Sequence, residues 1–226
     1  MTTPRVKVTE TDEGYVRLRQ AILRGQFLPS QRLVELDLAQ TFGIGRAAVR
    51  TALARLEQEG LVEREPHRGA SVRAISETEA VEMFEARAVL EGLAARYAAH
   101  NATDQDIEAL RMTEAQMRER LAAGDLLGMS EMNSLLHEQL LRIADNKTVA
   151  RLVDHLHAQH VRFQYRMILV PGRALESLQE HHALVEAVAA HDADAAEAAM
   201  RQHLAHVVDA LRHSAQSATY PRSSLL

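Results

Sequence analysis

Histidine is concentrated in one part of this chain of 226 residues. The sequence has twelve histidines, and eleven of them follow residue 75, whereas His67 precedes it. Imidazole binds divalent metal ions through a ring nitrogen and changes its charge near neutral pH. The excess therefore indicates metal binding or pH sensing in the later part of the chain.

Four polar residues fall on helix faces that are otherwise apolar. Asn133 and His137 lie at i and i+4 in residues 126–144, and His181 and His203 interrupt the apolar stripes of two later helices. Polar groups buried at such positions need partners. One divalent metal ion in the centre of a helical bundle would satisfy all four. Three imidazoles and an amide oxygen suit zinc, with nickel or manganese as alternatives.

The sequence also allows other interpretations of the histidines. A single buried histidine is commonly a hydrogen-bonded core residue rather than a ligand. His155, His157 and His160 form a group of their own, and His182 adjoins His181, so periodicity alone does not choose between the last two.

A metal-dependent hydrolase is the enzymatic alternative, because a three-histidine centre with an open position can activate water. The sequence disfavours it. Glu138 follows His137, but Leu141 stands where an H-E-x-x-H motif would place its second histidine.

The charge distribution predicts two domains, residues 1–75 and 76–226. The net charge is −5, yet the first segment has twelve Lys and Arg against nine Asp and Glu, whereas the second has fourteen against twenty-two. The absence of cysteine excludes disulfides, thiolate metal sites and cysteine nucleophiles. No apolar run is long enough for a membrane span, and residues 1–20 have no signal-peptide core, so we expect a cytoplasmic protein without membrane partners.

The first segment has the pattern of a winged helix-turn-helix. Apolar spacing predicts helices over residues 15–23, 36–42 and 46–60, with a glycine-containing turn between the second and third. Residues 61–64 and 70–73 alternate apolar with polar side chains, which predicts a β-hairpin, or wing. Arginines on the third helix and at the wing tip suit base edges and phosphates of double-stranded DNA.

Residues 18–72 closely resemble the winged helix-turn-helix of the GntR family of bacterial transcription regulators. The shared stretch includes GRAAVRTALARLEQEGLVEREPHRGASV. The resemblance implies that operator DNA is contacted by two helix residues and by the wing: Arg46, Arg50, His67, Arg68 and Gly69.

Two positions depart from that family pattern. Gly45 replaces the usual Ser or Thr before the arginine, which removes a helix N-cap and a phosphate contact. Leu36 stands where many members have an arginine that touches DNA.

The pattern of the second segment predicts a bundle of about six helices. The predicted fold class of the whole chain is therefore mainly α. Capping boxes at Ser76 with Glu79 and at Thr103 with Asp106 begin two of them. The remaining helices are predicted over residues 126–144, 148–168, 173–190 and 194–212.

Residues 78–215 resemble the FCD class of effector domains, through FEARAVLEGLAARYAA, NSLLHEQLLRIADN and EHHALVEAVAAHDADAAEAAMRQHL. The class places two ligand histidines about 22 residues apart on its last two helices, and this spacing selects His181 with His203. The metal ligands implied are Asn133, His137, His181 and His203.

The resemblance also implies an effector. Asn133 replaces a more common aspartate, which leaves the site one unit more positive and favours an anion. The resemblance assigns Arg87 to binding the carboxylate of a small organic acid, while Arg162 and Arg166 are interpreted as surface residues.

Together these features predict a homodimeric DNA-binding transcription regulator, not an enzyme. A small carboxylate effector at the metal site would control its affinity for the operator. The alternative is a metal sensor, in which the ion itself is the signal.

Overall fold

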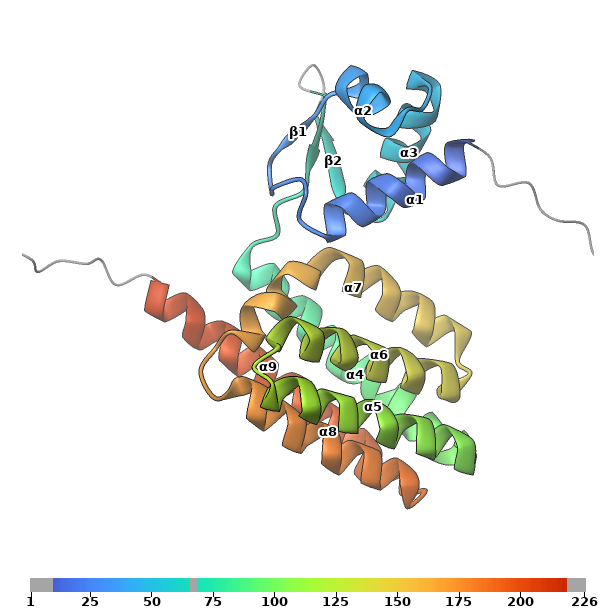
Figure 1. The fold of residues 1–226 in the computed structure, drawn as a ribbon, viewed down its shortest axis with the longest axis vertical. Helices are drawn as coiled ribbons and strands as arrows, with labels where there is room; N and C mark the ends of the chain where they lie inside the picture. Colours follow the sequence, from blue (N-terminus) through green and yellow to red (C-terminus); the bar gives the residue numbers. More distant parts are fainter. Residues whose placement is uncertain (1–9, 66–68, 219–226) are drawn as a thin grey trace, which may run out of the picture. The chain divides into compact units, whose positions relative to one another are not determined.

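The computed structural model describes residues 10–65 and 69–218 of the chain (Figure 1), with backbone only for residues 10–11, 157–166, 168 and 214–218. The contacts group into two compact units, Met1–Ile75 and Ser76–Leu226. The predicted fold class is confirmed: the described chain is mainly helical, with one small sheet in the first unit.

Three helices form most of the first unit: α1 (Glu10–Leu23), α2 (Glu35–Phe42) and α3 (Arg46–Gln58). The glycine-containing turn between α2 and α3 is present, because Gly43 adopts the left-handed conformation (φ 63°) that ends α2. Gly45 is the N-cap of α3 and provides no side-chain hydrogen bond, which is the missing cap expected from the sequence. Helix α1 begins five residues earlier than the apolar pattern predicts.

The wing is a three-stranded antiparallel sheet with strand order β1-β3-β2. The predicted hairpin consists of β2 (Val62–Glu65) and β3 (Gly69–Val72). Strand β1 (Arg32–Leu33) was not predicted, because two residues are too short to show a period-two pattern. His67 and Arg68 lie outside the described residues.

Helix α1 packs against α3 and closes the core of the first unit. Most apolar positions of the predicted helical patterns are buried, among them Leu18, Ile22, Leu38, Val49, Leu53 and Leu56. Val16 and Leu36, which belong to the same patterns, are exposed. Beside this core, the Arg55 guanidinium lies 3.8 Å from the ring centroid of Tyr15 and is paired with Asp12. The packing leaves the opposite face of α3 available to solvent.

The described part of the second unit contains the six predicted helices (Figure 1), which are α4 (Glu77–Asn101), α5 (Asp104–Ala122), α6 (Leu126–Ala144), α7 (Lys147–Ile168), α8 (Arg173–Ala189) and α9 (Ala193–Ala218). The Ser76 hydroxyl accepts the backbone N–H of Glu79, and Thr103 and Asp106 form a complete reciprocal capping box. No helix in the described chain has the length and apolar character needed to cross a bilayer.

Helix α4 is the central helix of the bundle and packs against α6, α7, α8 and α9. Small residues at the contact allow close approach, since Ala94, Ala95 and Ala98 are at most 2% exposed. At Gly92, an added Cβ would lie 2.8 Å from Cγ of Arg201 on α9. Because α4 is surrounded, charged side chains on it are forced into the interior, and two of them reach the site described next.

Candidate metal centre and DNA-binding surface

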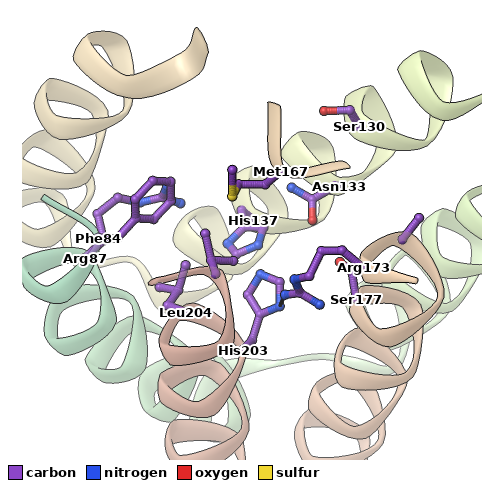
Figure 2. A pocket seen from close by; sticks show the side chains of 12 residues that line it. Phe84, Arg87, Ser130, Asn133, His137, Met167, Arg173, Ser177, His203 and Leu204 are labelled. Carbon is purple, nitrogen blue, oxygen red and sulfur yellow. Dashed lines mark hydrogen bonds between the residues drawn. The ribbon is translucent and has the colours of Figure 1, made fainter. Parts of the chain in front are cut away.

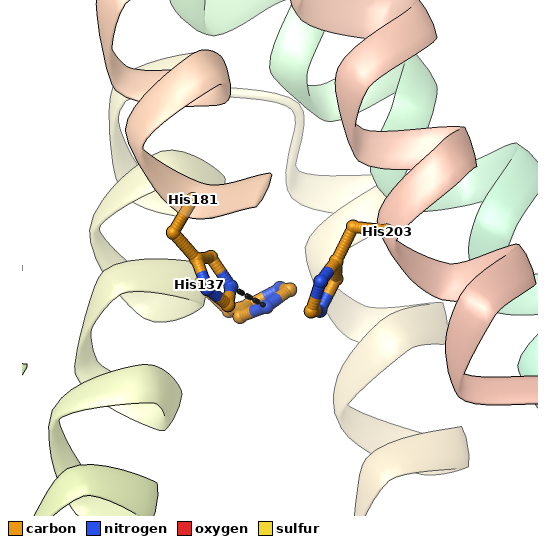
Figure 3. A group of neighbouring side chains, drawn as sticks. All are labelled: His137, His181 and His203. Atoms are coloured by element: carbon orange, nitrogen blue, oxygen red, sulfur yellow. Dashed lines mark hydrogen bonds between the residues drawn. The ribbon is translucent and has the colours of Figure 1, made fainter. Parts of the chain in front are cut away.

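Three histidines from three helices converge inside the bundle (Figure 3). His137 on α6, His181 on α8 and His203 on α9 are all buried, and their candidate ligand atoms lie within 4.8 Å of one another. The structure thus brings together three of the four residues predicted from the interrupted apolar stripes into one cluster that could hold a metal ion.

Each histidine of this triad is oriented by a hydrogen bond from its Nδ1. His137 donates to the Glu91 carboxylate (2.5 Å), His181 to the backbone carbonyl of Ser177 (2.6 Å), and His203 to the Glu180 carboxylate (2.7 Å). These partners only accept hydrogen bonds, so each Nδ1 carries the proton and each Nε2 keeps a lone pair. Fixing the tautomer in this way is typical of histidines that bind metals.

The spacing of the Nε2 atoms fits a metal ion. Nε2 of His137 and Nε2 of His181 are 3.3 Å apart. With both protons on Nδ1, two lone pairs face each other, an arrangement that a cation near both atoms would stabilise. An ion about 2.0–2.1 Å from each nitrogen would place two ligands about 3.0–3.4 Å apart in tetrahedral or octahedral geometry.

Burial and neighbouring charges keep two histidines of the triad, His181 and His203, in the form that binds metals. Burial is the main reason that the pKa of His181 is lowered well below its usual value, and the nearby His203 and His137 lower it further. Burial likewise lowers the pKa of His203, together with the charges of His137 and Arg173. Both rings are therefore neutral at neutral pH, as metal ligation requires.

Glu91 is a buried carboxylate that the sequence analysis did not identify. It is 1% exposed and accepts hydrogen bonds from His137 and from Nε of Arg87 (2.5 Å). Burial alone would raise its pKa, but the charges of Arg87 and His137 and their hydrogen bonds outweigh burial and lower the pKa below its usual range. Glu91 thus stays ionised and links the predicted Arg87 to the triad.

A cavity of about 60 Å³ borders the triad (Figure 2). Asn133 lines it, one turn before His137 on α6. Arg87 also lines it and is 5% exposed, with its guanidinium 5.2 Å from the ring centroid of Phe84. The structure therefore places both predicted residues at the cavity, with Arg87 already paired to a carboxylate.

Arg173 lines the same cavity and is a second buried arginine, which the sequence analysis treated only as the start of a helix. Glu180 was missed as well, although it lies next to His181 in the sequence. The available signal was the Arg-to-Glu spacing of seven residues, which places both side chains on one face of α8.

The adjacent histidines of α8 have different environments. His181 is fully buried in the triad, whereas the His182 side chain is 56% exposed and pairs with Glu114 on α5. His155 is exposed. The side chains of His157, His160, Arg162 and Arg166 lie outside the described part of the chain.

The first unit exposes the two arginines that the sequence predicts to contact DNA. The side chains of Arg46 and Arg50, one turn apart on α3, are 61% and 60% exposed. Glu35 on α2 lies between them, with Nε of Arg50 at 2.8 Å and Nη2 of Arg46 at 3.8 Å from its carboxylate. This acidic residue was not predicted. It forms exposed ion pairs with both guanidinium groups.

A surface hollow separates α2 and α3 from the wing. Gly69 lines it and begins β3 at φ 83°, in the left-handed region that favours glycine. Arg32 and Arg64 add two arginines to the lining, and Arg64 donates to the backbone carbonyl of Arg50. Leu36 and Val34, 53% and 41% exposed, are apolar side chains among these charged residues.

Two family models match the chain. The model for bacterial regulatory proteins of the gntR family matches residues 11–72, and the model for the FCD domain matches residues 82–206. Together they cover both compact units. The chain therefore belongs to the GntR family of DNA-binding transcription regulators and carries an FCD domain.

Named relatives agree with this assignment. The chain is 30% identical to the Nta operon transcriptional regulator of Aminobacter aminovorans over 158 residues, which are 69% of this chain and 73% of that protein. It is 28% identical to the HTH-type transcriptional repressor RspR of Escherichia coli (strain K12), over 89% of each chain.

Solved structures share the fold. The structure of E. coli McbR/YncC matches with a TM-score of 0.78 at 20% identity, over 92% of this chain and 99% of that one. A GntR regulator from Rhodococcus sp. RHA1 matches with a TM-score of 0.72 at 23% identity, over 93% and 99%. Proteins of this family are regulators rather than enzymes, and they bind DNA and are commonly dimeric.

Proposed function

We propose that the FCD unit binds one divalent metal ion, with zinc as the preferred ion. We further propose that a small organic acid bound beside the ion controls operator binding. The ligands would be Asn133, His137, His181 and His203. Bound zinc would supply a fixed double positive charge and a position for an anionic ligand. The observation that carries this proposal is the convergence of three Nε2 lone pairs, each oriented by an acceptor at Nδ1.

The ligand set favours an anionic effector. Asn133 is neutral, and the two histidines whose pKa values are lowered are neutral as well, so they do not offset the charge of the ion. Arg87 lines the same cavity and supplies a guanidinium suited to a carboxylate.

Operator binding is proposed for the first unit. Arg46 and Arg50 would enter the major groove, and the wing residues His67, Arg68 and Gly69 would contact the backbone or the minor groove. We infer that the chain acts as a homodimer in the cytoplasm, because dimers are common in its family and bind two half-sites. RspR is named a repressor, so repression is the outcome we expect.

Metal content tests the ligand set directly. Purified wild type should contain one equivalent of zinc per chain by mass spectrometry, and His181→Ala should lose it. His182→Ala is the matched control, because its ring is exposed and paired with Glu114. Equal loss of zinc in the two variants, or wild type without bound metal after zinc loading, would contradict the proposal.

DNA binding tests the regulatory assignment. Wild type should shift the DNA upstream of its own gene in a salt-dependent manner, whereas Arg46→Ala should not. The metal-sensor alternative rests on the triad, which could bind an ion without an acid. A graded response of DNA binding to zinc alone would favour the sensor. A response that also requires an added acid supports the effector proposal.

A further inference from the structure

Arg173 is a buried arginine at the cavity beside the triad. It is the first residue of α8 and is 4% exposed, and it lines the cavity together with Asn133, His137 and His203. Figure 2 shows its guanidinium extending toward His203, across the cavity from Arg87 and Phe84. A charged side chain in this position faces the place proposed for the effector.

Only part of the Arg173 guanidinium has hydrogen-bond partners among the described residues. Nη2 donates to the Glu180 carboxylate at 2.7 Å. Nη1 is buried and has no hydrogen-bond partner among the described residues, a condition that it shares there with only one other buried side-chain atom, Oε1 of Gln139. A buried N–H of a charged group without an acceptor is strongly unfavourable. The orphaned Nη1 therefore indicates an acceptor that the described chain does not supply.

The charges of the described residues around the cavity cancel in pairs. Arg87 is paired with Glu91, and Arg173 is paired with Glu180. The imidazoles and the amide of Asn133 supply no negative charge, so the two positive charges of a bound divalent ion remain uncompensated. This step rests on the metal site proposed above. Because a net charge buried in a protein is costly, an occupant with two negative charges is favoured.

The geometry sets the size of that occupant. Nη2 of Arg173 is 3.5 Å from Nδ1 of His203, so about one imidazole ring separates the guanidinium from the Nε2 side of the triad. The cavity itself measures only about 60 Å³. Two acidic groups joined by a short carbon chain would fit this distance, whereas a nucleotide or a sugar phosphate would not.

We propose that the effector is a small dianion of the dicarboxylate class, and that Arg173 is its second anchor. One carboxylate faces the Nε2 atoms of the triad, and the other accepts from Nη1 of Arg173. Arg173 is then the residue that distinguishes a dicarboxylate from a monocarboxylate, because only the former reaches both positive centres.

Calorimetry on the zinc-loaded full-length chain tests this with succinate and monomethyl succinate, which share the same four-carbon chain and differ by one charge and one methyl group. Wild type should bind succinate about tenfold more tightly or better, the usual value of a charge-assisted pair. Arg173→Met should remove this preference while its affinity for monomethyl succinate stays within about twofold, because the ion-facing carboxylate is unchanged. Arg111→Met is the matched control, since Arg111 is exposed and pairs with Glu186 on the surface.

The outcomes separate this inference from the proposed function. Equal binding of the two acids to wild type would overturn the dianion and leave the metal and acid site standing. Absence of binding for both acids, despite bound zinc, would overturn the inference and the effector proposal together. Where Arg173→Met does not fold, the wild-type comparison decides, and Arg173→Lys, which retains a positive charge, should keep a preference for succinate.

Discussion

The candidate sites of the two units use the same chemical pair, arginine with glutamate, at opposite degrees of burial. In the winged unit the side chains of Arg50 and Glu35 are 60% and 32% exposed, whereas those of Arg87 and Glu91 in the bundle are 6% and 2% exposed. An exposed pair contributes little and is screened by salt, so its arginine can exchange glutamate for a DNA phosphate. A buried pair does not separate without a large cost, so it orients neighbouring groups permanently.

Glu91→Gln should have the largest effect, because it leaves the buried Arg87 without a counter-charge and removes the acceptor of His137. We expect a loss of about 3–5 kcal/mol in the free energy of unfolding of the metal-free chain. Zinc affinity should fall about 10- to 100-fold. Urea denaturation and competitive zinc titration measure the two.

Glu85→Gln is the control on the same helix, since Glu85 pairs with Arg212 on the surface with both side chains about half exposed. It should change stability by less than about 1 kcal/mol. If the two variants lose the same free energy of unfolding, burial does not determine how much each Arg–Glu pair contributes to stability.

Arg50→Ala should weaken DNA binding without changing metal binding or stability. The loss of an arginine at a base edge or phosphate is expected to cost about 1–3 kcal/mol of binding to the upstream DNA. Zinc content and the urea midpoint should stay at wild-type values, because this side chain is exposed. Fluorescence anisotropy provides the measurement, and unchanged DNA affinity would remove Arg50 from the interface.

Glu35→Gln should strengthen binding to DNA of unrelated sequence, because it frees the two arginines and removes a negative charge beside the phosphates. The expected gain is roughly 1 kcal/mol, about fivefold in affinity at low salt. The gain should shrink as salt is raised. Weaker binding by this variant would instead show that Glu35 reads a base or positions the arginines for contact.

Asp106→Asn should give the smallest effect and tests the pH dependence of an exposed contact. Hydrogen bonds from Thr103, followed by the one from Arg142, lower the pKa of Asp106 to about 2. A carboxyl with a lowered pKa stabilises the fold above its unfolded pKa near 3.9, and this contribution is lost as the pH falls toward 2.

The difference in stability between wild type and Asp106→Asn should therefore be about 0.5 kcal/mol at pH 7 and should vanish near pH 2. Urea midpoints measured at pH 7, 5, 4 and 3 follow it. A difference independent of pH would mean that the ionised carboxylate is not the stabilising group.

Much of the fold was predictable because its signals are local. Helix periodicity, the capping box at Thr103 and the turn at Gly43 each depend on a few adjacent residues. Strand β1 was missed for the same reason, since Arg32 and Leu33 become a strand only by pairing with Ser71 and Ala70.

The site was predictable only in part. His137, His181 and His203 were visible because each interrupts an apolar stripe. Glu91 was not, because α4 has charged residues on both its exposed and its buried faces, such as Glu85 and Glu91, and so shows no clear apolar stripe for a buried charge to interrupt. Its partner His137 lies 46 residues away, so the contact exists only after the bundle has formed.

We propose that occupancy of the bundle controls DNA binding by the winged unit. The direct measurement is the affinity of the zinc-loaded chain for the DNA upstream of its own gene, with and without succinate, for wild type and His137→Ala. We predict that succinate changes wild-type affinity by about fivefold or more and leaves His137→Ala unchanged. Equal wild-type affinity with and without zinc and succinate would show that the bundle does not control DNA binding.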